Sequence, residues 1–217
     1  MAKARITVIG AGLMGPGIAQ VFATAGYAVK LRDVGQPPLE RGMGNIQKSL
    51  ATFVEKGKVS QEESNAAIAR ITTTTELRDL ADCDLVVEAI FENFDAKKAV
   101  FEKLDLLLKS EAILASNTSS IDITRLAAVT NRPDRVIGMH FFNPVPLMSL
   151  VEISRGLSTS DETYAGVRDL AQKLGKTPVE LRYYPGCGAN RILTATPNAA
   201  VVALFGGRDP KDNERTL

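Results

Sequence analysis

Arg5-Ile-Thr-Val-Ile-Gly-Ala-Gly-Leu-Met-Gly-Pro-Gly-Ile-Ala-Gln20 is the stretch of sequence that decides the fold. Its β-branched apolar start, residues 6–9, predicts a buried parallel strand. A Gly-x-Gly-x-x-Gly turn follows at once, and residues 18–25 have the apolar content of a packed helix. A second apolar strand, residues 27–31, leads to Asp33. Strand, glycine turn, helix, strand and acid in this order are typical of a βαβ unit that binds a dinucleotide.

Each glycine of the turn has a physical reason to be there. Gly10 permits the tight turn, Gly12 lets the backbone approach a pyrophosphate, and Gly15 lets the helix pack closely on the strand. The start of the helix offers unpaired N–H groups to the phosphates. We expect Leu13 and Met14 to line the cofactor site together with these glycines. The alternative is a purely structural turn, because glycine-rich turns without a ligand are common.

Asp33 decides which dinucleotide we expect. It lies about 20 residues beyond the glycine turn, where an acid accepts hydrogen bonds from the adenine ribose. A carboxylate there repels the 2′-phosphate of NADP, so the sequence favours NAD. Arg32 is a counter-argument, because an arginine beside the ribose could accept that phosphate.

The composition describes an ordinary globular protein. Of 217 residues, 45% are hydrophobic and 24% are charged, and the net charge is +1. This balance gives no reason to expect nucleic acid or a membrane surface as partner. We see no signal-peptide pattern and no apolar run of about 18 residues, so we expect a cytoplasmic protein. Cys83 and Cys187 have no metal-ligand spacing around them, which favours two reduced thiols and no metal site.

Strands and helices alternate along the rest of the chain. This pattern predicts an α/β fold, a Rossmann-like doubly wound and mostly parallel sheet. We expect strands at residues 6–9, 27–31, 72–75, 85–90, 112–115, 136–139, 150–153 and 177–181. We expect helices at residues 18–25, 39–56, 60–71, 95–108, 121–129 and 161–174, the second and third forming a pair that projects from the sheet.

Polar side chains should begin most of these helices. Ser60 has a glutamate three residues later and predicts a capping box. Asp95 and Asp161 are the expected caps of the two later long helices. Ser119 or Ser120 is the expected cap of the short helix between them.

His140 is the only histidine in the chain. It follows a predicted strand on the edge where ligands bind in parallel sheets, in a rigid apolar loop. Glu152 on the next strand could orient the imidazole and raise its basicity, which makes His140 a candidate general base for a hydroxyl proton. The alternative is a histidine with a structural role only, and Glu152 could be a surface carboxylate.

Two further polar residues are candidates for holding a reacting oxygen. Ser119 could donate its hydroxyl to a substrate oxygen, unless it only caps a helix. Asn190 could donate its amide to a developing oxyanion, or cap a helix in its turn.

Six stretches together resemble the 3-hydroxyacyl-CoA dehydrogenase family, and most closely its bacterial 3-hydroxybutyryl-CoA members. The similarity extends over nearly everything up to Arg191. The stretches are Gly10-Ala-Gly-Leu-Met-Gly-Pro-Gly-Ile-Ala-Gln20, Val87-Glu-Ala-Ile-Phe-Glu-Asn93, Ala115-Ser-Asn-Thr-Ser-Ser120, His140-Phe-Phe-Asn-Pro-Val-Pro146, Leu150-Val-Glu152 and Asn190-Arg191.

The resemblance implies a reaction and a site. The reaction is hydride transfer between NAD and C3 of a short-chain 3-hydroxyacyl-CoA, such as 3-hydroxybutyryl-CoA or acetoacetyl-CoA. His140 matches the catalytic base, Glu152 its partner, and Ser119 and Asn190 the residues that hold the reacting oxygen. Cofactor contacts match Glu92, Lys97, Asn143 and again Ser119. Ser49 and Lys56 match contacts to coenzyme A, although a solvated helix face explains their spacing as well.

The sequence departs from the family beyond residue 185. We expect residues 1–185 to form the NAD-binding domain and residues 186–217 to be a short remnant of the family's C-terminal helical domain. Cys187-Gly-Ala replaces bulky apolar residues, and Pro197 interrupts the final helix. Residues 190–205 are apolar enough to fold back on the sheet or to join copies into a homo-oligomer.

Two other functions stay open from the sequence. A shortened NAD-binding module with little or no turnover is the main alternative. Another β-hydroxyacid dehydrogenase is the third, but relatives of that kind generally use lysine as catalyst, and His140 disfavours it.

Overall fold

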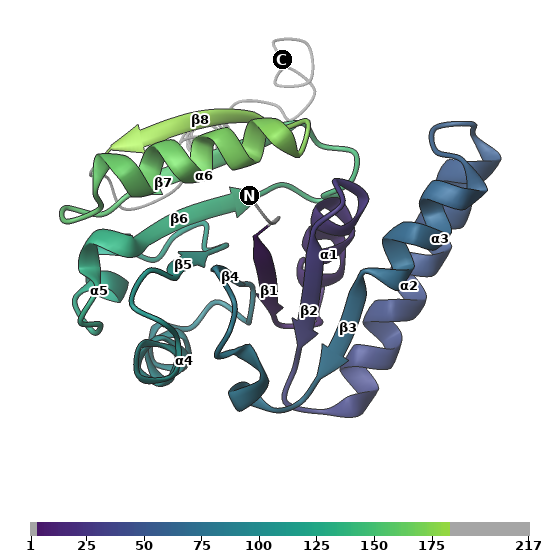
Figure 1. The fold of residues 1–217 in the computed structure, drawn as a ribbon. Helices are drawn as coiled ribbons and strands as arrows, with labels where there is room; N and C mark the ends of the chain where they lie inside the picture. The colour runs from purple at the N-terminus through teal and green to yellow at the C-terminus, as the bar shows by residue number, and fades with distance from the viewer. Residues whose placement is uncertain (1–3, 183–217) are drawn as a thin grey trace, which may run out of the picture.

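The computed structural model describes residues 4–182, and these fold around one eight-stranded sheet (Figure 1). The strand order is β3-β2-β1-β4-β5-β6-β7-β8. All neighbouring strands run parallel except β6 and β7, which are antiparallel. The predicted α/β, mostly parallel fold is confirmed. The strands are β1 Arg5–Ile9, β2 Ala28–Arg32, β3 Ile71–Thr74, β4 Leu85–Glu88, β5 Ile113–Ser116, β6 Val136–Phe141, β7 Leu150–Arg155 and β8 Thr177–Arg182.

Helices cover both faces of the sheet, as a doubly wound fold requires. Successive side chains of β1 show why: Val8 packs in one apolar cluster with α1, α2 and α6, whereas Ile9 packs in a second cluster with α4 and α5. The helices are α1 Gly15–Thr24, α2 Gln36–Glu55, α3 Gln61–Ala69, α4 Phe94–Leu107, α5 Ile123–Ala127 and α6 Asp161–Lys173, with 3₁₀ turns η1 Leu77–Leu80 and η2 Pro133–Arg135.

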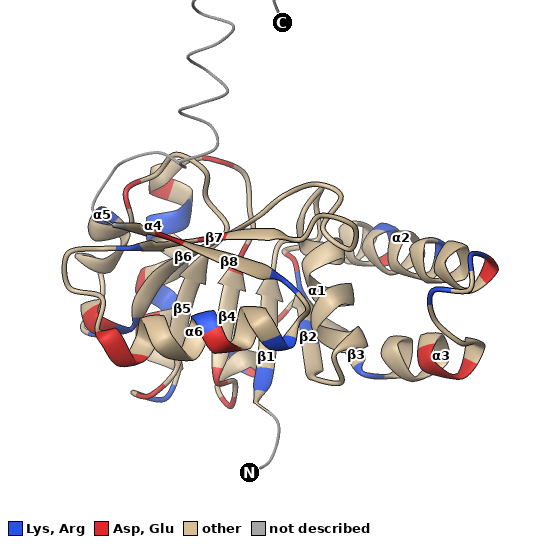
Figure 2. Cartoon of the chain, turned by 90° about the horizontal axis from the view of Figure 1, so that it is seen from above, with Lys and Arg blue, Asp and Glu red and all other residues tan. Residues whose placement is uncertain are grey.

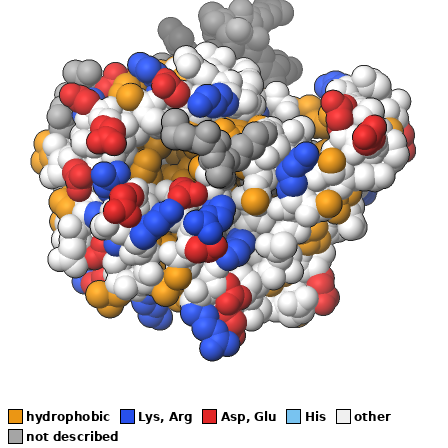
Figure 3. Space-filling view, in the orientation of Figure 1, with side chains coloured by type: hydrophobic (Ala, Val, Ile, Leu, Met, Phe, Trp, Pro, Cys, Tyr) orange, Lys and Arg blue, Asp and Glu red, His pale blue; other side chains and the backbone are white. Residues whose placement is uncertain are grey.

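Helices α2 and α3 form the pair that extends away from the sheet beyond β3 (Figures 1 and 2). The predicted capping box is present, because Ser60 and Glu63 bond to each other's backbone N–H groups. Helix α2 begins earlier than the predicted residue 39, because residues 36–38 form its first turn. Proline is tolerated in a first turn, where its missing N–H has no helical partner to lose. In Figure 3, acidic and basic side chains are interspersed over the visible face of the molecule.

Three of the predicted caps are wrong by a few residues. Helix α4 is capped by Asn93, α5 by Asp122 and α6 by Ser160, each through a side-chain oxygen that accepts a backbone N–H. Several cap-forming residues stand in a row at each of these starts, and local sequence does not rank them. The expected caps Asp95 and Asp161 lie in the first helical turn, where their charge complements the helix dipole.

Strand β6 is longer than predicted. His140 lies within it and not in a following loop, because β6 continues to Phe141 through its antiparallel pairing with β7. The sequence between Phe141 and Leu150 forms the β6–β7 loop, residues 142–149. The predicted C-terminal remnant, residues 186–217, lies outside the described residues, as do Asn190 and Cys187.

Candidate active site

The glycine turn connects β1 to α1 at the carboxyl edge of the sheet. Gly10 has φ +104°, and a Cβ there would lie 2.5 Å from the Ala89 carbonyl oxygen. A Cβ on Gly15 would lie 1.7 Å from the Gly10 carbonyl oxygen, so only glycine fits. A Cβ on Gly12 would meet nothing within 4 Å, which leaves room for a ligand. No side chain caps α1, so its first N–H groups are available to an anion.

Asp33 lies directly beside this turn. Its Oδ2 accepts a hydrogen bond from the Ala11 N–H at 2.7 Å, and its Oδ1 accepts one from the Val34 N–H at 2.7 Å. These bonds fix the carboxylate at the end of β2, where the sequence places the ribose acid. The Arg32 side chain has another partner: its Nε donates a hydrogen bond to the Thr75 carbonyl at 3.3 Å. The carboxylate, and not the guanidinium, therefore borders the turn.

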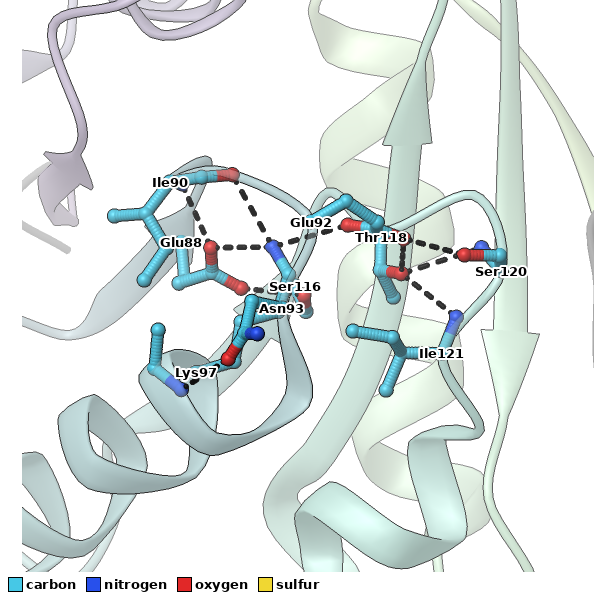
Figure 4. A network of polar contacts seen from close by, with 10 residues as sticks. Glu88, Ile90, Glu92, Asn93, Lys97, Ser116, Thr118, Ser120 and Ile121 are labelled. Atoms are coloured by element: carbon cyan, nitrogen blue, oxygen red, sulfur yellow. Dashed lines mark hydrogen bonds and ion pairs between the residues drawn. The ribbon is translucent and has the colours of Figure 1, made fainter.

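A buried ion pair lies under the ends of β4 and β5 (Figure 4). The Lys97 ammonium is 2.7 Å from Glu88 Oε1, and the two side chains are 1% and 0% exposed. The Ser116 hydroxyl donates to Glu88 Oε2 at 2.6 Å. Lys97 also reaches Glu92 Oε2 at 3.4 Å. Lys97 thus lies beneath Glu92, with its ammonium in contact with two carboxylates.

Glu92 accepts hydrogen bonds from two hydroxyl groups of the loop after β5. The Ser120 hydroxyl donates to Glu92 Oε1 at 2.8 Å, and the Thr118 hydroxyl donates to the same oxygen. Burial alone would raise the pKa of Glu92, but these two bonds and the charge of Lys97 together lower it below its usual 4.5. Glu92 is therefore an ionised hydrogen-bond acceptor at neutral pH.

His140 and Glu152 are paired across β6 and β7. They lie directly opposite each other in the antiparallel register, and His140 Nδ1 is 3.1 Å from Glu152 Oε2. Their side chains are 13% and 4% exposed, so the pair is shielded from bulk water. A carboxylate on Nδ1 fixes the tautomer that has its lone pair on Nε2, which is the state a general base needs.

Several of the predicted site residues line one cavity of about 490 Å³, whereas Asp33, Lys97 and Glu152 do not. It lies between the glycine turn, the loop after β4, the loop after β5 and the end of β6. Its lining includes Leu13, Met14, Glu92, Asn117, Ser119, His140 and Asn143.

Two smaller cavities continue this one toward the projecting helices. The first, about 210 Å³, shares Leu13 and Asn143 with the large cavity and reaches Ser49 on α2. The second, about 200 Å³, shares Ser49 with the first and ends at Lys56. Because neighbouring cavities share lining residues, the three lie in series from His140 to Lys56, and we call this series the path. Sequence analysis did not single out Gln20, Asn45 or Lys58, three polar residues that line the two smaller cavities.

The spacing of Asn45 could have identified it as a lining residue, because it lies four residues before Ser49 and so on the same helix face. Asn117 was missed as well. Its side-chain oxygen accepts the Phe141 N–H at 2.8 Å and so ties the loop after β5 to the end of β6.

Comparison with known proteins agrees with this geometry. Residues 5–183 match the family described as 3-hydroxyacyl-CoA dehydrogenase, NAD binding domain. The chain belongs to the 3-hydroxyacyl-CoA dehydrogenase family. A probable 3-hydroxybutyryl-CoA dehydrogenase of Deinococcus radiodurans is 52% identical over 200 residues, which are 92% of this chain and 72% of the relative.

Other members of the family are similar to the same extent. A 3-hydroxybutyryl-CoA dehydrogenase of Bradyrhizobium diazoefficiens is 48% identical over 203 residues, 94% of this chain and 69% of the relative. The crystal structure of an (S)-3-hydroxybutyryl-CoA dehydrogenase from Ralstonia eutropha has a TM-score of 0.92 at 42% identity. The aligned part is 97% of this chain and 75% of the Ralstonia eutropha chain.

The described part of this dehydrogenase fits NAD as its cofactor. The uncapped start of α1, the open space at Gly12 and the acid at the end of β2 are the features that a dinucleotide uses. The comparisons do not favour the alternative of a binding module without turnover. Among residues 4–182, no helix has the length and apolar content needed to cross a membrane.

Proposed function

We propose that this chain transfers hydride between NAD and C3 of a short-chain 3-hydroxyacyl-CoA, and that it does so in the cytoplasm. The observation that carries the proposal is the position of His140, 3.1 Å from Glu152 and on the wall of the cavity that Leu13 and Met14 of the glycine turn also border. The names of the similar proteins support the short acyl chain. Residues 1–185 are proposed as the domain that binds the cofactor.

In the proposed oxidation, His140 Nε2 takes the proton of the C3 hydroxyl as the C3–H bond breaks and a carbonyl forms. NAD held by the glycine turn and Asp33 would supply the acceptor for the hydride and its electron pair. Glu152 keeps the imidazole oriented and stabilises the imidazolium that results. Ser119, on the same cavity, donates its hydroxyl to the C3 oxygen, and Asn190 is proposed for the same oxygen from sequence alone.

The residues expected to contact the cofactor fall into two groups, those that line the large cavity and one that is buried behind it. Leu13, Met14, Glu92 and Asn143 line the large cavity and are proposed as direct contacts. Lys97 is 1% exposed, and its ammonium is occupied by Glu88 and Glu92. We propose that Lys97 acts on the cofactor through Glu92, whose carboxylate it holds in place.

The path of three cavities offers a place for an elongated ligand such as an acyl-CoA. Its inner end holds His140 and takes the thioester, and its outer end holds Ser49 and Lys56. The ammonium group of Lys56 is proposed to bind a phosphate of coenzyme A, with Lys58 beside it. The expected association of copies through residues 190–205 rests on the sequence alone, and light scattering would test it.

A steady-state assay with NADH and acetoacetyl-CoA tests the proposed function. The wild type should oxidise NADH with acetoacetyl-CoA faster than with a long-chain 3-ketoacyl-CoA. His140→Gln should lower kcat by about two to four orders of magnitude, the usual contribution of a positioned general base. NADH affinity, measured by fluorescence on the same samples, should stay unchanged. A wild type that binds NADH but reduces no 3-ketoacyl-CoA would overturn the proposal, as would a His140→Gln variant that keeps most of the rate.

A further inference from the structure

Lys176 is a buried charged residue outside the cavities described so far. It lies between α6 and β8 and is 9% exposed. Its ammonium donates to the carbonyl oxygens of Val145 at 2.6 Å and Met148 at 2.7 Å. Both acceptors belong to the β6–β7 loop, so one side chain from the far edge of the sheet holds this loop at two points.

This arrangement costs stability. No carboxylate within residues 4–182 forms an ion pair with Lys176, and burial lowers its pKa, which means that burial disfavours the charged form. An apolar side chain of similar length would pack at this position without that penalty. In return, the ammonium makes the two hydrogen bonds to the loop, which an apolar side chain could not make.

Other contacts hold the β6–β7 loop at its start and in its middle, and its later half forms a turn. At its start, Asn117 accepts the Phe141 N–H. In its middle, Val145 is 2% exposed and packs on Gly17, where an added Cβ would lie 3.0 Å from the Val145 Cβ. Toward its end, the Pro144 carbonyl accepts hydrogen bonds from the Leu147 and Met148 N–H groups, at 2.9 and 3.0 Å.

The same loop forms one wall of the proposed substrate path. Asn143 lines the large cavity beside His140 and also the next cavity outward. Pro144 and Pro146 line the two outer cavities, together with Ser49 of α2. A small displacement of this loop would change the width of the path without touching the His140–Glu152 pair, which β6 and β7 hold.

We propose that Lys176 is a positioning residue that holds the β6–β7 loop in place and so keeps the path between this loop and α2 open for the acyl-CoA. The proposal rests on the proposed function, because the path matters only if an acyl-CoA occupies it. Lys176 itself touches neither substrate nor the reacting atoms.

The test is steady-state kinetics of Lys176→Met, Lys176→Arg and Lys173→Met with NADH and acetoacetyl-CoA. Lys176→Met should raise the KM for acetoacetyl-CoA by about tenfold or more, because small displacements of positioning groups have large effects. Its kcat should stay within about threefold of the wild type, since the base pair is unchanged. Lys176→Arg keeps the donors and has the adjoining cavity of about 360 Å³ to occupy, so it should restore a KM near that of the wild type.

Lys173 is the matched control, because it lines the same adjoining cavity but is exposed and makes no hydrogen bond to the loop. Lys173→Met should behave as the wild type. Hydrogen exchange gives a second reading: the Leu147 and Met148 amides should exchange faster in Lys176→Met while those of β6 do not.

The outcomes separate the two proposals. If the wild type and Lys173→Met reduce no acetoacetyl-CoA, the proposed function fails. If both are active and Lys176→Met keeps its KM, the role of Lys176 is wrong. Should Lys176→Met not fold, Lys176→Arg is judged by KM and amide exchange together. Wild-type values of both, or a raised KM with faster exchange of the Leu147 and Met148 amides, support the proposal, and a change in one without the other overturns it.

Discussion

At the scale of single residues, Asp33 has two partners that its sequence position did not reveal. Its carboxylate accepts the N–H groups of Ala11 and Val34 and so links β2 to the glycine turn. Asp33→Ala should weaken NADH binding by about 1–3 kcal/mol, the cost of leaving a ribose hydroxyl unpaired in a buried site. NADPH should bind relatively better, because the repulsion of its 2′-phosphate is removed. Titration of both cofactors checks this, and an unchanged NADH affinity would show that another group binds the ribose.

Cys83 should be an unreactive thiol. It is 1% exposed, and burial raises its pKa to about 11. Since the thiolate is the reactive form, iodoacetamide at pH 8 should leave Cys83 unmodified in the native protein and modify it in urea. Mass spectrometry of the peptide that carries Cys83 gives the answer, and rapid labelling of native protein would contradict the burial.

The candidate site divides into residues that the sequence could predict and residues that it could not. Gly10, Asp33 and His140 were predictable because each stands at the end of a strand, where local pattern and position agree. The burial of Lys97 beneath Glu92 was not, and neither was the reach of Lys176 to the β6–β7 loop. Both depend on distances between elements far apart in the chain, which no periodicity encodes.

At the scale of elements, the sequence predicted which helices and strands form, but not the residues at which they begin and end. Helix α2 begins earlier than expected because two prolines fit its first turn. Strand β6 ends later because pairing with β7 extends it over His140. The first effect is local and could have been foreseen, whereas the second needs a partner strand from elsewhere in the chain.

The contact between β1 and α1 gives a prediction at this scale. Gly15→Ala should destabilise the protein by about 3 kcal/mol, because its Cβ would meet the Gly10 carbonyl and force helix and strand apart. NADH binding should fall with it. Gly44→Ala is the control, since Gly44 lies in α2 with nothing within 4 Å of an added Cβ, and it should stabilise by about 0.5–1 kcal/mol. Urea unfolding measures both changes; equal stabilities of the two variants would refute the argument.

At the scale of the whole molecule, the length of each connection decides whether the next strand runs parallel or antiparallel. Parallel strands need a crossover of about a dozen residues or more. The β6–β7 loop, residues 142–149, is too short for that, so β7 must return antiparallel to β6. This reversal places Glu152 opposite His140. The topology of the molecule, and not local sequence alone, therefore assembles the candidate catalytic pair.

The balance of charges predicts how the whole molecule responds to acid. Burial alone would raise the pKa of Asp105, but hydrogen bonds from Asn131 and Arg132 lower it below its usual 3.8. Hydrogen bonding to Lys30 lowers the pKa of Asp82 in the same direction. A lowered pKa in the folded state means that the unfolded chain binds more protons as the pH falls, so stability from these groups is complete above the unfolded pKa and is lost below it.

The urea midpoint should therefore be nearly constant from pH 7 to about pH 5.5 and fall below about pH 4.5. Asp105→Asn should lower the midpoint at pH 7 and flatten its decline in acid, because the titrating group is gone. Glu102→Gln on the same helix is the matched control: its ion pair with Lys98 is exposed, so the acid profile should follow the wild type. Circular dichroism at a series of pH values measures all three proteins. A midpoint that rises as the pH falls, or an Asp105→Asn profile that parallels the wild type, would show that these carboxylates do not set the acid stability.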